Sequence, residues 1–454
     1  MSTTYPIKQR YLLIIGLAIC GNSFAESTDF DMGLSPLGLT TGYTHSGFNI
    51  SPSLTFGNVY NTNIYASSND QGTSGNNINS RRGVVGSYIA LFQPSIKINS
   101  DWNRHALGLS VGSSFARYAT QPKNNNTNNM NAQLNGKLDI LHNSFLDGSM
   151  GYTMGTVARN SPDQITSATP SNYVSKNFQS NYNHIFNWLN LKTGINAIRT
   201  DYDNTQSETN TTLQMSTQNN WMYSSNLRLG HFIKREYEAF VNVIYSKNVY
   251  DSTVCTNGNC GNTSNPITGN PVNGSVYNSV FNRDSSSYNF LTGMAFDITG
   301  LIKGDFSMGY LQGSYEDPRL PAISGMNGFG NLKWSVTPLT TVTANFGRII
   351  GPTTQVGVSG VLTTNMGLNV THELKRDIIL NLGINYSNYL YEGNSVAATE
   401  NRNDNLSMVS FRSRYLINKN ISTDLSYSYQ MRASNYEGSN YEASIIMLNI
   451  NGQY

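Results

Sequence analysis

The chain has few charged residues, and no apolar stretch after its amino terminus is long enough for a membrane-spanning helix. Charged residues make up 12% of the 454 residues and hydrophobic residues 38%. A spanning helix needs about 18 consecutive apolar residues, and residues 26–454 contain no such run. Lys and Arg number 29 against 27 Asp and Glu, so the basic excess of a nucleic-acid-binding protein is also missing. These absences exclude a helical membrane protein and a nucleic-acid partner.

The amino terminus has the three parts of a secretory signal peptide. Lys8 and Arg10 form a basic head, residues 11–20 are apolar, and residues 23–25 form a small-residue cleavage site. The apolar part is too short for a comfortable spanning helix. We expect cleavage after Ala25, which would leave equal numbers of basic and acidic residues in the mature chain.

Cysteine is scarce, with three residues in all. Cys20 belongs to the expected signal peptide, and a lipoprotein anchored there is an alternative that the bulky preceding Ile19 disfavours. Cys255 and Cys260 lie in the longest polar stretch, residues 251–284. In an oxidising compartment we expect them to form a disulfide worth about 2 kcal/mol. Two thiols without neighbouring His or acidic residues do not complete a tetrahedral metal site, so we expect no metal and no cofactor.

From residue 48 onward, short segments alternate between apolar and polar residues. In residues 378–386 the even positions carry Ile, Leu or Tyr, while positions 381, 383 and 385 carry Asn or Gly. Residues 107–115 show the same period of two. This period is typical of a β-strand with one face in an apolar environment and the other in water.

Short turns alternate strictly with longer polar connections between these segments. An up-and-down barrel with both termini in the periplasm connects its strands in this way, whereas a soluble β-sandwich, the alternative, crosses irregularly between sheets. An open sheet in lipid would leave its edge amides without partners. We therefore predict an all-β fold, a transmembrane up-and-down antiparallel β-barrel in the bacterial outer membrane.

The pattern predicts about 18 strands over residues 48–454. Residues 26–47 would precede the barrel as a periplasmic segment and a candidate plug. The count falls to about 16 if residues 173–184 and 328–337 are not strands. The predicted strands are 48–64, 84–99, 104–119, 130–140, 145–158, 173–184, 188–202, 218–230, 236–250, 286–298, 302–315, 328–337, 341–350, 357–371, 377–391, 404–416, 421–432 and 441–454.

Aromatic residues near the predicted strand ends suit a lipid–water boundary. The final segment ends at Tyr454, on the same face as Ile446, Leu448 and Ile450, and resembles the signal by which outer-membrane proteins are recognised for assembly. We expect the barrel-assembly machinery, outer-membrane lipid and lipopolysaccharide as partners. The tyrosines predicted at the boundary on the loop side are Tyr60, Tyr118, Tyr202, Tyr245, Tyr250, Tyr315 and Tyr389.

Polar positions opposite the apolar face would line the lumen. Cations there would favour anions in a narrow pore, which predicts a weak anion preference. The alternative is that the charges pair across neighbouring strands and brace the wall. Candidate pore-lining residues are Lys97, Lys137, Asp139, Lys192, Arg228, Glu238, Lys333, Arg412, Arg414 and Arg432, together with neutral Gln133, Asn135, Asn177, Gln179, Asn181, Asn226, Asn365 and Asn369.

The histidines do not suggest catalysis. All six lie before the first strand or beside predicted short turns, and a catalytic triad spread over separate hairpins would have to converge on one substrate. About eighteen strands also lie in the range that leaves an aqueous channel. We expect that the protein is not an enzyme, and a rim hydrolase remains a third alternative.

The first hairpin carries a family resemblance. Residues 52–56 (PSLTF) lead into residues 61–65 (NTNIY) and a polar loop, which resembles the opening of the putative beta-barrel porin 2 family of bacterial outer-membrane proteins. The resemblance implies an outer-membrane channel, and it suggests polysaccharide as a partner.

Two functions stay open on this sequence. The first is a porin-like channel for passive passage of small hydrophilic solutes, including oligo- or polysaccharide in either direction. The second is a structural or adhesive surface protein with Asn-rich extracellular loops and a plugged lumen. The loop 251–284 either narrows the pore or lies on the cell surface.

Overall fold

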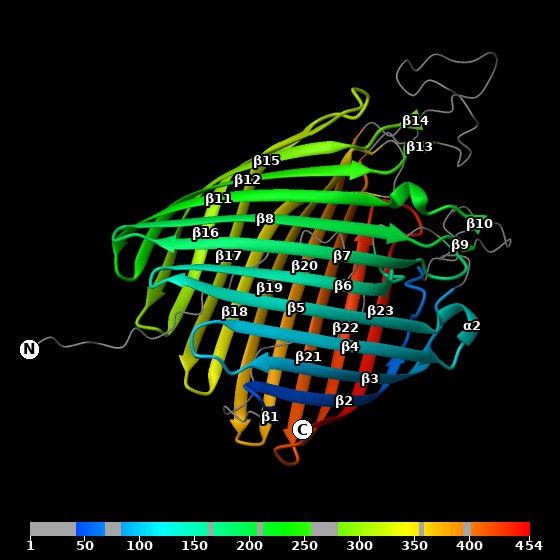
Figure 1. Cartoon of the computed structure of the whole chain (residues 1–454). Coiled ribbons are helices and arrows are strands. Elements are labelled where there is room, and N and C mark those ends of the chain that lie inside the picture. The colour runs from blue at the N-terminus through cyan, green and yellow to red at the C-terminus, as the bar shows by residue number, and fades with distance from the viewer. Residues whose placement is uncertain are drawn as a thin grey trace, which may run out of the picture.

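The chain forms a closed antiparallel β-barrel of 18 strands (Figure 1). The computed structural model describes residues 42–68, 83–161, 167–206, 212–255, 280–353, 358–393 and 401–454. The wall strands are β2 (Phe48–Asn61), β3 (Ser87–Ser100), β4 (Ala106–Tyr118), β5 (Thr127–Leu141), β6 (Ser144–Thr156), β7 (Asn172–Ile185), β8 (Leu189–Tyr202), β11 (Asn220–Lys234), β12 (Tyr237–Tyr250), β15 (Ser285–Ile298), β16 (Ile302–Tyr315), β17 (Ile323–Thr337), β18 (Thr340–Gly351), β19 (Gly360–Lys375), β20 (Ile378–Glu392), β21 (Asn403–Leu416), β22 (Ile421–Ser434) and β23 (Tyr441–Gln453).

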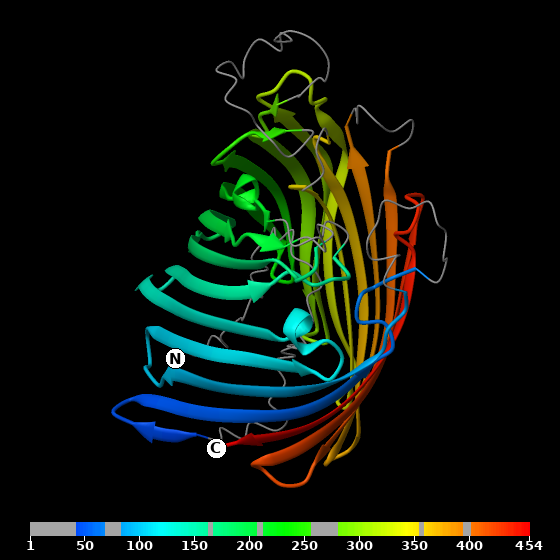
Figure 2. The same ribbon diagram turned by 90° about the vertical axis from the view of Figure 1, so that its right-hand side faces the viewer.

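The wall closes where β2 meets β23, as the adjacent blue and red strands in Figure 2 show. Ser53 lies opposite Gln453 at one end of this seam and Asn61 opposite Ile445 at the other. A further short strand, β1 (Tyr43–His45), pairs with the start of β2. Residues 43–45 of the candidate plug therefore belong to the wall, and residues 26–41 lie outside the described residues.

Short turns gather at one end of the barrel and long connections at the other (Figure 1). The long-connection end also carries the small elements α2 (Pro122–Asn125), β9 (Thr205–Gln206), η2 (Ser216–Gln218) and β13 (Val254–Cys255), with β10 (Thr212–Leu213) and β14 (Val280–Phe281) as hairpin partners. Outer-membrane barrels have short periplasmic turns and longer extracellular loops. The long-connection end is therefore the extracellular mouth.

The alternation in the sequence becomes two faces of the wall. Leu382 and Ile384 on β20 are about half exposed on the outer surface. Asn385, the residue after Ile384, faces the lumen. The same order holds on β21, where Val409 and Phe411 face outward. No helix among the described residues is long and apolar enough to cross a membrane.

Predicted strand ends agree with the observed ones within a few residues except at β17 and β19. β17 starts at Ile323 instead of residue 328, and β19 covers residues 360–375 instead of 357–371. Gly325, Gly328 and Gly330 interrupt the apolar alternation at the start of β17. Glycine has no side chain to mark a face, so this part of the strand gave no periodic signal.

Five of the seven tyrosines predicted at the lipid boundary face the lumen instead. Tyr60 and Tyr245 are on the outer face, and each ring packs at a tilt against the tyrosine ring of a neighbouring strand. Tyr118 lies opposite the buried Ile89. The prediction failed because a strand end near the mouth can bury an aromatic ring against an inward-folded loop. The inward tyrosines are Tyr118, Tyr202, Tyr250, Tyr315 and Tyr389.

The apolar clusters lie inside the barrel, close to the mouth. In one of them, Val59, Ile89 and Met447 from three wall strands pack together. In another, Ala66 from the first extracellular loop packs against Leu406 of β21. The loops therefore fold inward and cover the upper lumen wall.

Candidate functional site: the lumen and its extracellular mouth

The pairing register puts all ten predicted charged pore-lining residues on the inner face. Lys97, for example, alternates with Ile96, and Arg228 sits between the exposed Leu227 and Leu229. The full set is Lys97, Lys137, Asp139, Lys192, Arg228, Glu238, Lys333, Arg412, Arg414 and Arg432. The predicted neutral residues share this face, because they too alternate with exposed apolar residues.

Several of these charges are joined in ion pairs along the wall. Arg228 and Glu238 on β11 and β12 are 3.0 Å apart and largely buried. The Arg228 guanidinium also lies 3.5 Å from the centre of the Phe240 ring, and Glu238 accepts a hydrogen bond from Asn190 of β8. Lys137 and Asp139 form a looser pair at 3.5 Å. The Arg228–Glu238 pair ties neighbouring strands together, and both pairs remove fixed charge from the pore.

A second network crosses the closing seam. Arg414 of β21 donates to Asp424 of β22 at 2.7 Å. Asp424 also accepts from Asn451 of β23 at 3.0 Å, and Asn451 in turn accepts from Thr55 of β2 at 2.8 Å. Side-chain bonds thus reinforce the backbone ladder where the first and last wall strands meet.

Amide side chains line much of the remaining lumen. A hollow of about 420 Å3 on the inner wall is bordered by Asn135, Gln179 and Asn181, with Lys137 and Asp147 beside them. The Asn181 amide donates to Asp147 at 2.9 Å. Such a wall offers both donors and acceptors to hydrated solutes.

The mouth is narrowed by the loop that follows β6. Its Arg159 is buried and donates to the carbonyl oxygens of Asn124, Ser167 and Ala168 at 3.0 to 3.3 Å. The guanidinium also lies over the ring of Tyr65, which belongs to the first loop. One arginine therefore holds three loops together at the rim.

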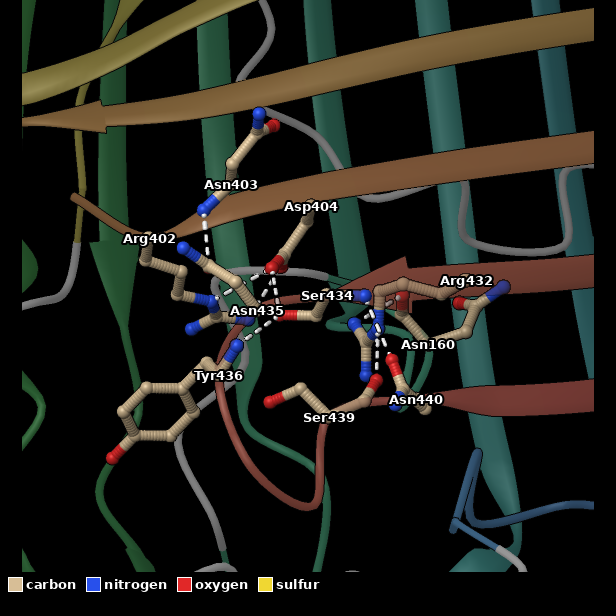
Figure 3. A network of polar contacts seen from close by, with 10 residues as sticks. All are labelled: Asn160, Arg402, Asn403, Asp404, Arg432, Ser434, Asn435, Tyr436, Ser439 and Asn440. Carbon is tan, nitrogen blue, oxygen red and sulfur yellow. Dashed lines mark hydrogen bonds and ion pairs between the residues drawn. The ribbon is translucent and has the colours of Figure 1, made fainter. Parts of the chain in front are cut away.

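The same loop reaches the far part of the wall at Asn160 (Figure 3). The Asn160 amide donates to Gln430 of β22 at 3.0 Å, and Arg432 donates to the Asn160 carbonyl at 3.4 Å. Arg432 also donates to the carbonyl of Ser439 at 2.7 Å. The predicted pore-lining Arg432 therefore anchors a loop instead of facing open solvent.

A buried carboxylate supports this anchor. Asp404 at the start of β21 is fully buried, pairs with Arg402 at 2.5 Å and accepts a hydrogen bond from Ser434 (Figure 3). Asn435 accepts from the backbone of Asn403. The β21–β22 side of the mouth is thus a rigid polar frame.

A family model for putative beta-barrel porin 2 matches residues 35–454. The chain belongs to this family. The match covers the whole barrel and begins before β1, which agrees with the resemblance of the first hairpin.

Solved structures of other outer-membrane barrels are similar to this family member. The ferric citrate transporter FecA is 12% identical, with a TM-score of 0.43 over 88% of this chain and 65% of that chain, so this chain spans about two thirds of its length. The siderophore receptor PirA from Acinetobacter baumannii is 7% identical, with a TM-score of 0.45 over 89% of this chain and 80% of that chain. The outer membrane protein OpdK from Pseudomonas aeruginosa is 8% identical, with a TM-score of 0.43 over 89% of this chain and 99% of that chain. No curated protein sequence matches the chain.

Sequence reasoning missed the loop anchors. Arg159, Arg283 and Arg402 are loop residues whose positions show no period, and only the fold brings them to the mouth. The irregular end of β18 could have been found in the sequence, because the adjacent apolar residues Ile349 and Ile350 break the alternation of that strand. Within the described residues, no three His, Cys, Asp or Glu side chains gather as a metal site. The predicted Cys255–Cys260 disulfide and most of loop 251–284 lie outside the described residues.

Proposed function

We propose that the protein is an outer-membrane channel for passive passage of small hydrophilic solutes. The observation that carries this proposal is the closed wall with a polar inner face, which includes an amide-lined hollow. Barrels with about 16 to 18 strands leave an aqueous channel. A wall of amide donors and acceptors suits sugars, which supports oligosaccharide as a solute class. Export from the cytoplasm would use the amino-terminal signal, and assembly would use the strand that ends at Tyr454.

Weak anion preference is part of the proposal. Lys192 and Lys333 face the lumen, and neither forms an ion pair with a carboxylate in the described parts of the chain. Unpaired cations in a narrow lumen lower the barrier for anions.

Planar-bilayer recordings in a salt gradient test both parts. We expect steady conductance with a reversal potential that indicates a small excess of anion flux. The double variant K192Q/K333Q should shift that potential toward zero, because it removes the unpaired charge. Lys176→Gln is the control, since Lys176 shares the outer face with Phe178 and should leave the potential unchanged. Clear cation preference would refute the anion preference.

A plugged surface protein is the second candidate, and the loop contacts at Asn160 favour it. In that case the bilayer would carry no steady current although the protein has inserted and folded. The same recordings therefore separate the two functions.

A further inference from the structure

One seam of the barrel is open toward the mouth. The pairing of β17 with β18 stops at Phe329 opposite Gly347. Beyond that point, residues 323–328 of β17 pair with β16 alone, and the described residues offer them no partner on the other side. The end of β18 is still paired with β19 up to Gly351 opposite Val361. Thus β18 and β19 leave β17 together.

The end of β18 leans into the lumen. A Cβ on Gly313 of β16 would lie 2.9 Å from the Cδ1 atom of Ile350, although a whole strand separates β16 from β18 in the wall. Similarly, a Cβ on Gly360 would collide with the hydroxyl oxygen of Tyr315. Ile349 and Ile350 share a small pocket with inward residues of β11, β12 and β16.

This position buries an apolar patch on the inner wall. Leu311 and Ile323 are 2% and 1% exposed, although both face the lumen. Ile244 on β12 is equally covered, at 3%. Burial of apolar surface stabilises the inward position.

Arg283 latches the inward position. It donates to the carbonyl of Thr353, just after β18, at 2.7 Å, and to Gln218 at 3.5 Å. It also donates to the carbonyl of Thr217 and lies 4.2 Å from the centre of the Tyr250 ring. A single buried guanidinium thus fastens the end of β18 to the loops that precede β11 and β15.

We propose that residues 348–353, the gate segment, set the size of the solutes that pass, and that they move between two positions. This inference rests on the proposed channel function. In the closed position the segment lies across the mouth, held by Arg283. In the open position it extends the β17–β18 ladder, with residue 348 opposite 328 and residue 350 opposite 326. Ile350 then joins Met326 on the lipid face.

Each position satisfies groups that the other leaves unpaired. The closed position half-buries Ile349 and Ile350 beside Leu311 of the inner wall but leaves the β17 edge without strand partners among the described residues. The open position supplies those partners, whose absence is costly in a membrane. Two arrangements with compensating contacts are what a two-state element requires.

Two disulfide locks that share one cysteine test the gate segment. Both are built in the C255S/C260S background so that the added thiols are the only ones in the mature chain. G313C/I350C locks the closed position, and M326C/I350C locks the open one. Disulfide formation is measured by mass spectrometry on the folded barrel. Solute size is measured by liposome swelling with neutral sugars of increasing length.

We expect both disulfides to form under mild oxidation. The M326C/I350C bond should form to a several-fold greater extent when Arg283→Gln removes the latch. Arg104→Gln, in the exposed short turn between β3 and β4 at the opposite end of the barrel, is the control and should not change it. The open lock should admit larger sugars than the closed lock, and reduction should abolish the difference.

Two results would overturn the gate. One is that the M326C/I350C variant stays reduced both with native Arg283 and with the added substitution Arg283→Gln. The other is that both disulfides form and the two locked barrels have the same size limit for sugars that they admit. If both bonds form and no sugar passes any form, the segment moves but the channel function itself is refuted.

Discussion

Buried arginines in this barrel donate mainly to backbone carbonyl oxygens. Arg159, Arg283 and Arg432 each join chain segments that are distant in the sequence. A planar guanidinium has five donors, so one side chain can satisfy several loop carbonyls at once. Since each of these arginines is nearly buried, its removal would leave those carbonyls unpaired. The mouth is therefore built from hydrogen bonds that a periodic sequence pattern does not reveal.

Asp317 gives the loops a pH-dependent contact. Burial alone would raise the pKa of this carboxyl, but hydrogen bonds from the Arg319 side chain and from the backbone N–H groups of Arg319 and Asn282 outweigh burial. The pKa therefore lies below its ordinary value of 3.8. A lowered pKa contributes stability above the unfolded value, and that stability is lost as the pH falls through the folded value.

We therefore expect Asp317→Asn to lower the unfolding free energy by about 1–2 kcal/mol at neutral pH. The difference from the native chain should shrink as the pH falls below the ordinary pKa of 3.8. Urea titrations in detergent micelles at several pH values measure it. Asp284→Asn is the control: burial raises the pKa of Asp284, so its charge costs stability as the pH rises, and the slope should have the opposite sign. Equal slopes for both variants would contradict this account.

At the scale of elements, glycines determine where the backbones of neighbouring strands can come into close contact. A Cβ on Gly309 of β16 would collide with the carbonyl oxygen of Phe290 on β15. The contact is with backbone, which cannot rotate away as a side chain does. At Gly136 of β5, by contrast, nothing lies within 4 Å of such a Cβ.

Gly309→Ala should therefore destabilise the barrel by about 1–3 kcal/mol, because the β15–β16 ladder must shift. Gly136→Ala should be neutral or slightly stabilising, since Gly in a strand interior is itself unfavourable. Urea unfolding followed by tryptophan fluorescence compares the two variants. Equal stabilities would show that β15 and β16 are farther apart than described.

Most strands could be predicted from the sequence, whereas the course of β18 could not. The period of two located β20, β21 and β23 within one or two residues. The inward lean of β18 depends on Arg283 and on an apolar patch from three other strands, and none of these lies near it in sequence. The same reason explains why the period of two assigns Arg432 to the inner face but does not show that it anchors a loop.

At the scale of the whole molecule, two solvents shape the wall. Outer residues meet lipid and inner residues meet water, so neighbouring positions on one strand tolerate opposite substitutions. Ile384 on the outer face and Asn385 on the inner face offer a matched pair.

Ile384→Arg should lower the free energy of unfolding in lipid vesicles by about 2–4 kcal/mol, because a charge near the bilayer midplane is costly. Asn385→Arg should change it by less than about 1 kcal/mol, because the lumen hydrates the guanidinium. The measurement is urea-dependent folding into vesicles, followed by the heat-dependent shift in gel mobility. A larger loss of stability for Asn385→Arg than for Ile384→Arg would contradict the assignment of these residues to the lumen and lipid faces.

The sequence by itself determined the closed antiparallel barrel, the approximate strands and the face on which most side chains of the regular strands lie. It could do so because a period of two in hydrophobicity is a local property that two solvents impose on every strand. Only the tertiary structure decided which charges pair, which tyrosines turn inward and how the mouth is narrowed. Those features come from contacts between loops and distant strands, and their positions depend on barrel closure and register, which no local pattern encodes.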